Sequence, residues 1–131
     1  MLNVIVPIGV VRNGISVSQD FSEVISEIEI FEEFKEGLFR LDESKEIVVL
    51  FVFDRNIGKG HKKVLHPKGD ESIPVVGVFA SRSPFRPNPI GVTTVELISV
   101  RDNVLTVKGL DAFDGTPVID IKPAERRDGG R

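Results

Sequence analysis

Apolar residues recur along this chain in short runs that favour β-strands. Between Val24 and Phe31 isoleucine alternates with glutamate, the period of two expected of a strand with one buried face. The run from Glu46 to Phe53 is almost wholly apolar, which predicts a strand buried on both faces. Further strands are predicted over Val4–Arg12, Ile73–Ala80 and Pro117–Lys122.

Two more strand patterns are separated by only two residues. Ile90–Arg101 and Val104–Leu110 flank Asp102 and Asn103, which both tolerate the left-handed conformations of a tight hairpin. Strands that leave their edges unpaired invite association with other chains, and closure of the sheet removes those edges. We therefore expect a mostly β fold, a single small β-barrel, with one short helix.

The helix is predicted over Glu32–Leu41. Phe34, Leu38 and Leu41 follow one another at spacings of four and three residues, which places them on one helical face. Gly37 lies in the middle of the segment and costs about 1 kcal/mol relative to alanine. The predicted helix is therefore short and weak.

Two long segments between the strands are predicted to be loops. Arg55–Ser72 contains several glycines and much of the basic charge, and loops of this length commonly carry function. Ser81–Pro89 reads SRSPFRPNP, and its three prolines are incompatible with a regular element. We expect this second segment to be a stiff surface loop.

The composition fits one domain. A chain of 131 residues with 40% hydrophobic content can bury one core, so we expect a single domain over 1–131 with a flexible tail over 124–131. The absence of cysteine excludes disulfides and thiolate chemistry. The N-terminal sequence MLNVIVPIGVV has neither a basic leader nor an apolar run long enough to span a bilayer, which predicts a cytoplasmic protein without a membrane partner.

The charges are distributed unevenly around a net value of −3. Asp20–Glu46 contains ten acidic and three basic residues, whereas Arg55–Gly91 contains seven basic and two acidic residues. The negative total argues against a general nucleic-acid coat, which needs excess cations to displace counterions from phosphate. The basic segment is either a solvated face or a patch for RNA phosphates. Its lysines are Lys59, Lys62, Lys63 and Lys68.

The common catalytic spacings are missing. The chain has neither GxGxxG nor GxxxxGK[ST], which argues against a Rossmann or P-loop site. His61 and His66 are the only histidines, and they lie in the basic loop without carboxylates at ligand spacing. We expect them to lie on the loop surface, and we expect no metal site. The pattern identifies no catalytic base.

The proline-rich loop is a candidate ligand site. A segment stiffened by proline loses little entropy on binding, so its polar side chains would be pre-organised donors for a carboxylate or a phosphate. Those side chains are Arg82, Ser83, Arg86 and Asn88. The alternative is a rigid turn whose arginines pair with local acids.

The last predicted strand offers a second candidate. Asp120 and Lys122 lie on one face of it, and Ile119 and Ile121 lie on the other. An amino-acid zwitterion would fit such a pair of charges. A simple ion pair would explain them equally well.

Two segments resemble the TsaA/TrmO methyltransferase family. Residues 77–91, GVFASRSPFRPNPIG, look like the signature of that family. The DGTP at 114–117 and the DIKP at 120–123 look like its second motif. Pro7-Ile8-Gly9 and the Leu50-Phe51-Val52-Phe53 strand also match, so the resemblance covers residues 7–123.

The resemblance implies a small β-barrel that binds S-adenosylmethionine without a Rossmann fold, as a homodimer with the cofactor near the interface. It also implies methylation of the exocyclic nitrogen of threonylcarbamoyl-adenosine beside the anticodon of tRNA. The cofactor contacts carried over by position fall on Gln19, Phe53, Asp54, Arg82, Val92, Ile119, Asp120, Ile121 and Lys122.

Residues expected to bind the substrate come from both lines of reasoning. Arg86 and Asn88 would order the proline-rich loop or hold RNA. Lys62 and Lys63 are expected to contact tRNA phosphates because of the charge distribution rather than the resemblance.

Two positions depart from the family pattern. Asp54 stands where family members commonly have histidine, and Ala124 stands where many have tyrosine. The alternative to an enzyme is therefore a non-enzymatic β-barrel that binds S-adenosylmethionine or RNA without turnover. A purely structural dimer module is a third possibility.

Overall fold

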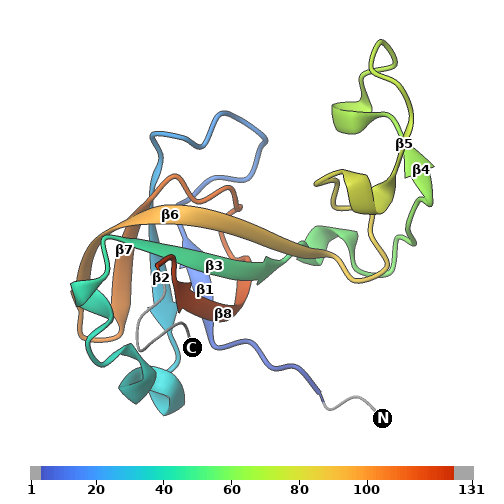
Figure 1. Ribbon diagram of the computed structural model, residues 1–131. Coiled ribbons are helices and arrows are strands. Elements are labelled where there is room, and N and C mark those ends of the chain that lie inside the picture. The colour runs from blue at the N-terminus through green and yellow to red at the C-terminus, as the bar shows by residue number, and fades with distance from the viewer. Residues whose placement is uncertain (1–3, 126–131) are drawn as a thin grey trace.

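The computed structural model describes residues 4–125, and within this range six antiparallel strands close into a barrel in the order β1-β2-β7-β6-β3-β8 (Figure 1). β1 pairs with β2 on one side and with β8 on the other, which completes the ring. The prediction of a mostly β barrel is confirmed. The strands are β1 (Gly9–Arg12), β2 (Ile25–Ile30), β3 (Glu46–Val52), β6 (Ile90–Arg101), β7 (Val104–Lys108) and β8 (Pro117–Pro123).

The barrel interior is filled by alternate residues of its strands. In β2 the buried positions are Ser26, Ile28 and Ile30, and the glutamates between them face outward. Burying each isoleucine contributes about 1.5–3 kcal/mol. The two-residue period of the sequence therefore gives the correct inward face for this strand.

The expectation that Glu46–Phe53 is buried on both faces is wrong for β3. Only Ile47, Val49 and Phe51 are buried, and the residues between them are partly exposed. A barrel strand has one interior face, so an apolar run on it must leave half of its side chains on the outside. The outer face of β3 is thus a partly exposed apolar surface.

The predicted helix is present as the 3₁₀ helix η1 (Glu32–Leu38), and a second 3₁₀ turn, η2 (Leu41–Glu43), follows it. Arg40 between them adopts a left-handed conformation with φ 67°, which interrupts a continuous helix. Phe34, Leu38 and Leu41 pack against the core. The predicted apolar face is therefore the one that is used.

Residues 54–89, here called the arm, project from one end of the barrel between β3 and β6 (Figure 1). The arm contains a two-stranded hairpin in the place of part of the predicted loop, because β4 (Val64–Leu65) pairs with β5 (Val76–Gly77). The strand expected over Ile73–Ala80 is therefore wrong except for its two middle residues. The other elements of the arm are the three-residue 3₁₀ turns η3 (Asp54–Asn56), η4 (Pro67–Gly69) and η5 (Val78–Ala80).

Of the remaining predicted elements, some are confirmed and one has a different boundary. The β6–β7 hairpin is confirmed, with Asp102 at φ 54° in its turn, and Ser81–Pro89 contains no helix or strand. β1 begins at Gly9 rather than at Val4, because its pairing with both neighbours begins there. The segment from Val4 to Val6 is exposed.

Candidate functional site

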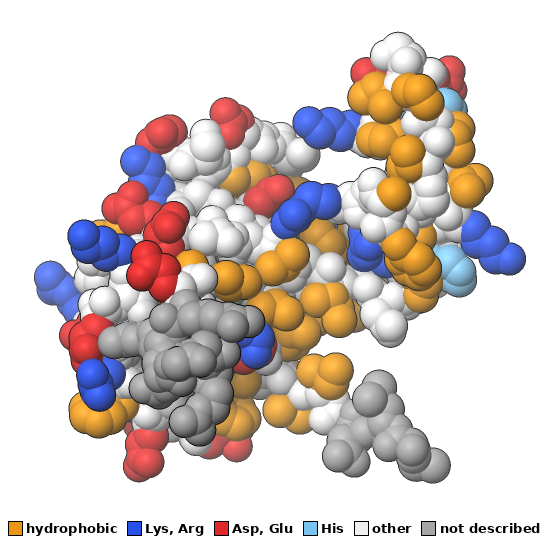
Figure 2. All heavy atoms as spheres, in the orientation of Figure 1, with side chains coloured by type: hydrophobic (Ala, Val, Ile, Leu, Met, Phe, Trp, Pro, Cys, Tyr) orange, Lys and Arg blue, Asp and Glu red, His pale blue; other side chains and the backbone are white. Residues whose placement is uncertain are grey.

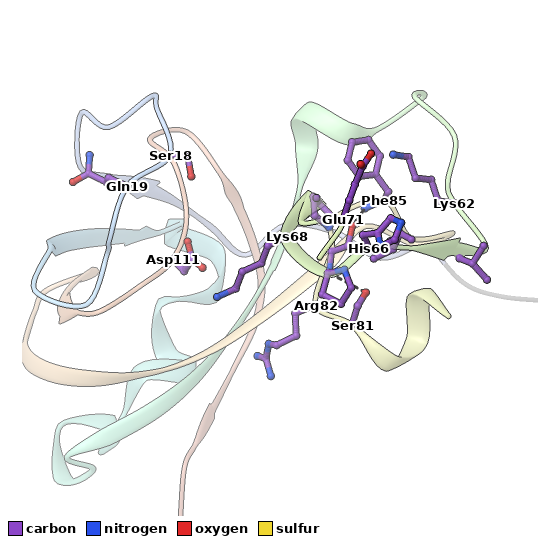
Figure 3. Close-up of a pocket in the computed structure, with 16 residues that line it drawn as sticks. Ser18, Gln19, Lys62, His66, Lys68, Glu71, Ser81, Arg82, Phe85 and Asp111 are labelled. Carbon is purple, nitrogen blue, oxygen red and sulfur yellow. Dashed lines mark hydrogen bonds between the residues drawn. The ribbon is translucent and has the colours of Figure 1, made fainter. Parts of the chain in front are cut away.

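A cleft separates the arm from the end of the barrel (Figure 2). Its main cavity has a volume of about 1330 Å³. Figure 3 shows Ser18, Gln19 and Asp111 on the barrel side and the side chain of Lys68 extending from the arm towards them. The arm side also presents His66, Glu71, Ser81, Arg82 and Phe85.

Two smaller cavities adjoin the main one at the base of the arm. One, of about 280 Å³, is lined by Arg82, Val92 and Phe53 among others. The other, of about 290 Å³, is lined by Phe53, Asp54 and Pro84 among others. The three cavities share lining residues and therefore adjoin one another, and together they are here called the cleft.

An aromatic pair forms the wall between the smaller cavities. The rings of Phe51 and Phe53 meet edge to face with their centroids 5.4 Å apart. Gly91 permits this packing, because a Cβ atom there would lie 2.4 Å from Cε2 of Phe51. The glycine therefore positions the wall of the cleft.

The proline-rich loop is held by its own arginines. Nη1 of Arg86 donates hydrogen bonds to the carbonyls of Ser81 at 2.9 Å and Ser83 at 3.0 Å. Arg86 is thus committed inside the loop, which favours ordering the loop over holding RNA. Asn88 is exposed, and its carbonyl accepts a hydrogen bond from the Ile90 amide at 2.7 Å.

Arg82 links this loop to the barrel. Its Nη2 donates to the Val92 carbonyl at 2.7 Å. A guanidinium has five N–H donors, so this bond restrains Arg82 and leaves other donors for a ligand in the cavities that Arg82 lines. The arrangement suits an anionic group such as a carboxylate.

The root of the arm is fastened by Arg55. Its Nη1 donates to the Ser16 carbonyl at 2.8 Å, and its guanidinium carbon lies 3.9 Å from the ring centroid of Phe113. Phe113 in turn meets Phe21 edge to face at 6.0 Å. These contacts set the angle of the arm over the cleft.

The residues expected on β8 lie elsewhere. Lys122 and Asp120 form an ion pair at 2.8 Å, which raises the pKa of the Lys122 ammonium through hydrogen bonding and charge attraction. Asp120 and Ile121 line a separate cavity of about 380 Å³ beside η1. Ile119 and Lys122 line neither that cavity nor the cleft.

One chain therefore brings together only part of the expected cofactor set. The residues that line the cleft are Gln19, Phe53, Asp54, Arg82 and Val92. The four residues of β8 are left outside it.

The basic residues of the arm divide between the cleft and the outer surface. The Lys62 ammonium lies 4.8 Å from the ring centroid of Phe85 within the cleft. Lys63 is exposed and does not line the cleft. His66, expected on the loop surface, is half-buried and places Nδ1 2.7 Å from the Ile73 carbonyl.

Sequence reasoning missed several lining residues, above all Asp111. It lines all three cavities of the cleft and lies just before the DGTP motif at 114–117. A carboxylate between two residues with buried side chains, Leu110 and Ala112, is the signal that could have identified it. Phe85 lies within the proline-rich loop already singled out as a candidate ligand site, whereas Ser18 had no such signal.

Two kinds of feature are missing from residues 4–125. No group of three or more histidines, aspartates and glutamates is placed there to hold a metal ion. No helix in this part of the chain is long and apolar enough to cross a membrane.

Comparison with known proteins gives consistent matches. Residues 12–127 match the family described as the tRNA-methyltransferase O N-terminal domain. An S-adenosyl-L-methionine-binding protein of Archaeoglobus fulgidus is 43% identical over 122 residues, covering 88% of this chain and 85% of that protein. The tRNA (adenine(37)-N6)-methyltransferase of Escherichia coli is 44% identical over 87 residues, covering 63% of this chain and 37% of that protein.

The fold matches solved structures as well. A TrmO crystal structure superposes with a TM-score of 0.72 and 29% identity, covering 98% of this chain. TrmO from Pseudomonas aeruginosa gives a TM-score of 0.70 and 28% identity, again over 98% of this chain. This chain spans 64% and 62% of those two chains, respectively.

Proposed function

This chain belongs to the family of the tRNA-methyltransferase O N-terminal domain, and from that membership we propose that it binds S-adenosylmethionine and methylates an adenine of tRNA. The observation that carries the proposal is the cleft, where cofactor residues expected from the sequence meet basic residues of the arm. When bound, the cofactor supplies an electrophilic methyl group on a sulfonium.

The side chains of the cleft fit such a cofactor. The free donors of Arg82 suit its carboxylate, and the carboxylate of Asp54 can accept hydrogen bonds from ribose hydroxyls. The partly exposed ring of Phe53 offers an aromatic face for a base. Aspartate at position 54, in place of the histidine common in the family, is thus compatible with binding.

The acceptor that we propose is the exocyclic nitrogen of threonylcarbamoyl-adenosine beside the tRNA anticodon, and the reaction belongs in the cytoplasm. The relatives named as tRNA (adenine(37)-N6)-methyltransferases support the position and the atom. The main cavity, with Lys62 and Lys68 on its arm side, supports an anionic substrate. The chain would act mainly by placing the acceptor in line with the methyl group.

We also propose that the working unit is a homodimer. Within one chain the β8 residues lie outside the cleft, so a second copy would have to supply them. The outer face of β6 carries Ile90 at 37% and Val92 at 43% exposure, and Phe79 in the arm is 80% exposed. Apolar surface of this kind is typical of protein interfaces. Sedimentation equilibrium measures the mass, and a monomer at all concentrations would contradict this part.

Cofactor binding and methyl transfer are tested together. At a hundredfold excess over its dissociation constant, S-adenosylmethionine should stabilise the fold by about 2.7 kcal/mol. Radioactive methyl groups from the cofactor should appear in total tRNA from a strain that lacks its own enzyme. The Arg82→Ala variant should lose most of the stabilisation, whereas Arg101→Ala, at the far hairpin, should keep it.

The outcomes separate the candidate functions. Binding together with methyl incorporation supports the enzyme. Binding without methyl incorporation would instead support the non-enzymatic binder. The departures from the family pattern at Asp54 and Ala124 are the reason for that alternative. Melting curves that do not respond to the cofactor would overturn the enzyme and the cofactor binder, and would leave only a barrel that binds RNA or a structural module.

A further inference from the structure

Asp111 occupies the point where the compartments of the cleft meet. Of the residues that line the cleft, it alone lines all three cavities. A methyl donor in one compartment and an acceptor in a neighbouring one meet beside the residues that the two cavities share. Asp111 is the only carboxylate among those shared residues; the others are Ser18, Phe51, Phe53, Ser81, Arg82 and Pro84.

The backbone on both sides of Asp111 is anchored. Leu110 is fully buried and Ala112 is 5% exposed, and the Ala112 carbonyl accepts a hydrogen bond from Nδ2 of Asn13 at 2.9 Å. Asp111 itself is exposed to the cleft. These contacts thus fix the main chain at Asp111 without using its carboxylate.

Within the described part of the chain, the Asp111 carboxylate has neither a hydrogen bond nor an ion pair. Asp120, by contrast, is paired with Lys122, and Asp114 accepts hydrogen bonds from two backbone amides. An uncommitted acceptor in a cleft that also carries Arg82 is available to a ligand that donates a hydrogen bond.

We propose that Asp111 is the catalytic residue that accepts the N–H proton of the exocyclic adenine nitrogen during methyl transfer, an inference that rests on the proposed function. The lone pair of that nitrogen is delocalised into the purine ring, so the nitrogen is a weak nucleophile. The nitrogen forms a bond to the methyl carbon as the carbon–sulfur bond breaks, and the sulfur keeps that electron pair as a thioether. The N–H proton passes to the Asp111 carboxylate and then to water.

Two other carboxylates line parts of the cleft but do not satisfy the same geometry. Asp54 lines only one of the small cavities, and Glu71 lines only the main cavity from the arm side. Neither lies at a boundary between compartments. The assignment therefore falls on Asp111, and a change at Asp54 should act on cofactor binding instead.

The experiment compares Asp111→Asn and Asp111→Glu with the parent chain. Asparagine keeps the shape and removes the proton acceptor, so kcat at saturating cofactor and tRNA should fall about a hundredfold or more, with KM for tRNA little changed. Glutamate should restore part of the rate. Calorimetry should show unchanged cofactor affinity for both Asp111 variants. Asp42→Asn, which removes a carboxylate beside η1, is the control and should change neither kcat, nor KM for tRNA, nor cofactor affinity.

Each outcome decides the inference. A kcat for Asp111→Asn equal to that of the parent would overturn it, and so would loss of cofactor binding in that variant, since Asp111 would then be a binding residue. If either Asp111 variant melts well below the parent, Asp111 has a structural role and the inference is also wrong. If the parent binds the cofactor but methylates no tRNA, the proposed function fails first, and this inference falls with it.

Discussion

Alanine in place of Gly91 would add one carbon atom to β6 where the barrel wall meets the cleft. That Cβ would lie 2.4 and 2.5 Å from the Cε2 and Cζ atoms of Phe51 and 3.0 Å from Cζ of Phe53. Carbon atoms pack at about 3.5–4.0 Å, so the Phe51 ring would have to move by about 1 Å. Phe51 is only 2% exposed and packs in the core, which leaves little room for that movement.

The magnitude follows from two opposing effects. Overpacking of a core costs about 1–3 kcal/mol. Alanine loses less conformational entropy than glycine in a strand, which returns about 0.5–1 kcal/mol. The middle of the two ranges gives a net loss of about 1 kcal/mol. For a chain of 131 residues this loss should lower Tm by about 3–6 °C. Cofactor affinity should fall as well, because the Phe53 ring forms part of the cleft wall.

Thermal melting followed by circular dichroism measures the shift. Gly37→Ala is the matched control, because a Cβ atom at Gly37 meets nothing within 4 Å and should leave Tm unchanged or slightly raised. Phe51→Leu combined with Gly91→Ala should be less destabilising than the sum of the single changes, since the smaller side chain removes the clash. If Gly91→Ala melts at the temperature of the parent, the packing account of this wall is wrong.

Three further predictions concern the arm and the turns. Reversing Lys62 and Lys63 to glutamate should weaken tRNA binding for all tRNA sequences, because phosphate contacts do not read the bases. The dependence of binding on salt should also become less steep, by about 0.7 in logarithmic slope for each single-strand phosphate that the variant no longer neutralises. Filter binding at several salt concentrations would measure both effects. Hydrogen bonds from the backbone amides of Gly14 and Asn13 lower the pKa of the Asp114 carboxyl below its ordinary value. The charged carboxylate therefore stabilises the fold at pH values above the ordinary pKa, and this stabilisation is lost as the pH falls through the lower pKa of the folded state. The difference in unfolding free energy between the parent and Asp114→Asn should shrink on acidification, as urea unfolding would show. Arg55→Ala should reduce cofactor affinity in calorimetry with little change in Tm, because it releases the root of the exposed arm.

Each of these has a control and a contrary outcome. Lys45→Glu with Arg101→Glu makes the same charge change at the far end of the barrel and should leave tRNA binding almost unaltered. If both double variants lose the same tRNA affinity, the lysines of the arm do not contact tRNA specifically and only solvate its surface. An Asp114→Asn difference that does not depend on pH would contradict the pKa argument. A Tm for Arg55→Ala far below the parent would assign Arg55 to stability rather than to the cleft.

The barrel could be predicted from the sequence because its signals are local. The two-residue period of β2 and the Asp102-Asn103 turn depend on neighbours along the chain, and the structure confirms both. The two-sided burial expected of β3 failed for the opposite reason. Whether the outer face of a strand is covered depends on the rest of the molecule, and an apolar run carries no information about that.

The cleft was less predictable because it is made by the arm. Prolines correctly marked Ser81–Pro89 as irregular, but the strand expected over Ile73–Ala80 is reduced to β5. The β4–β5 pairing joins positions about a dozen residues apart with only two residues on each side. The angle of the arm depends on Arg55 reaching Ser16 and Phe113, contacts over long sequence separations. The meeting of the three compartments at Asp111 could not be inferred without them.

The ion pair on β8 shows why a correct local prediction can leave a role open. The sequence placed Asp120 and Lys122 on one face, and the structure joins them at 2.8 Å, as the simpler alternative required. Both side chains are exposed, so breaking their ion pair costs little free energy. Asp120 could then bind the ammonium of a ligand, and Lys122 could bind its carboxylate. The pair therefore does not argue against a binding role. Its position does, because in one chain it lies outside the cleft, and only a second copy could carry it there. The role of β8 thus depends on the same measurement of mass that tests the proposed dimer.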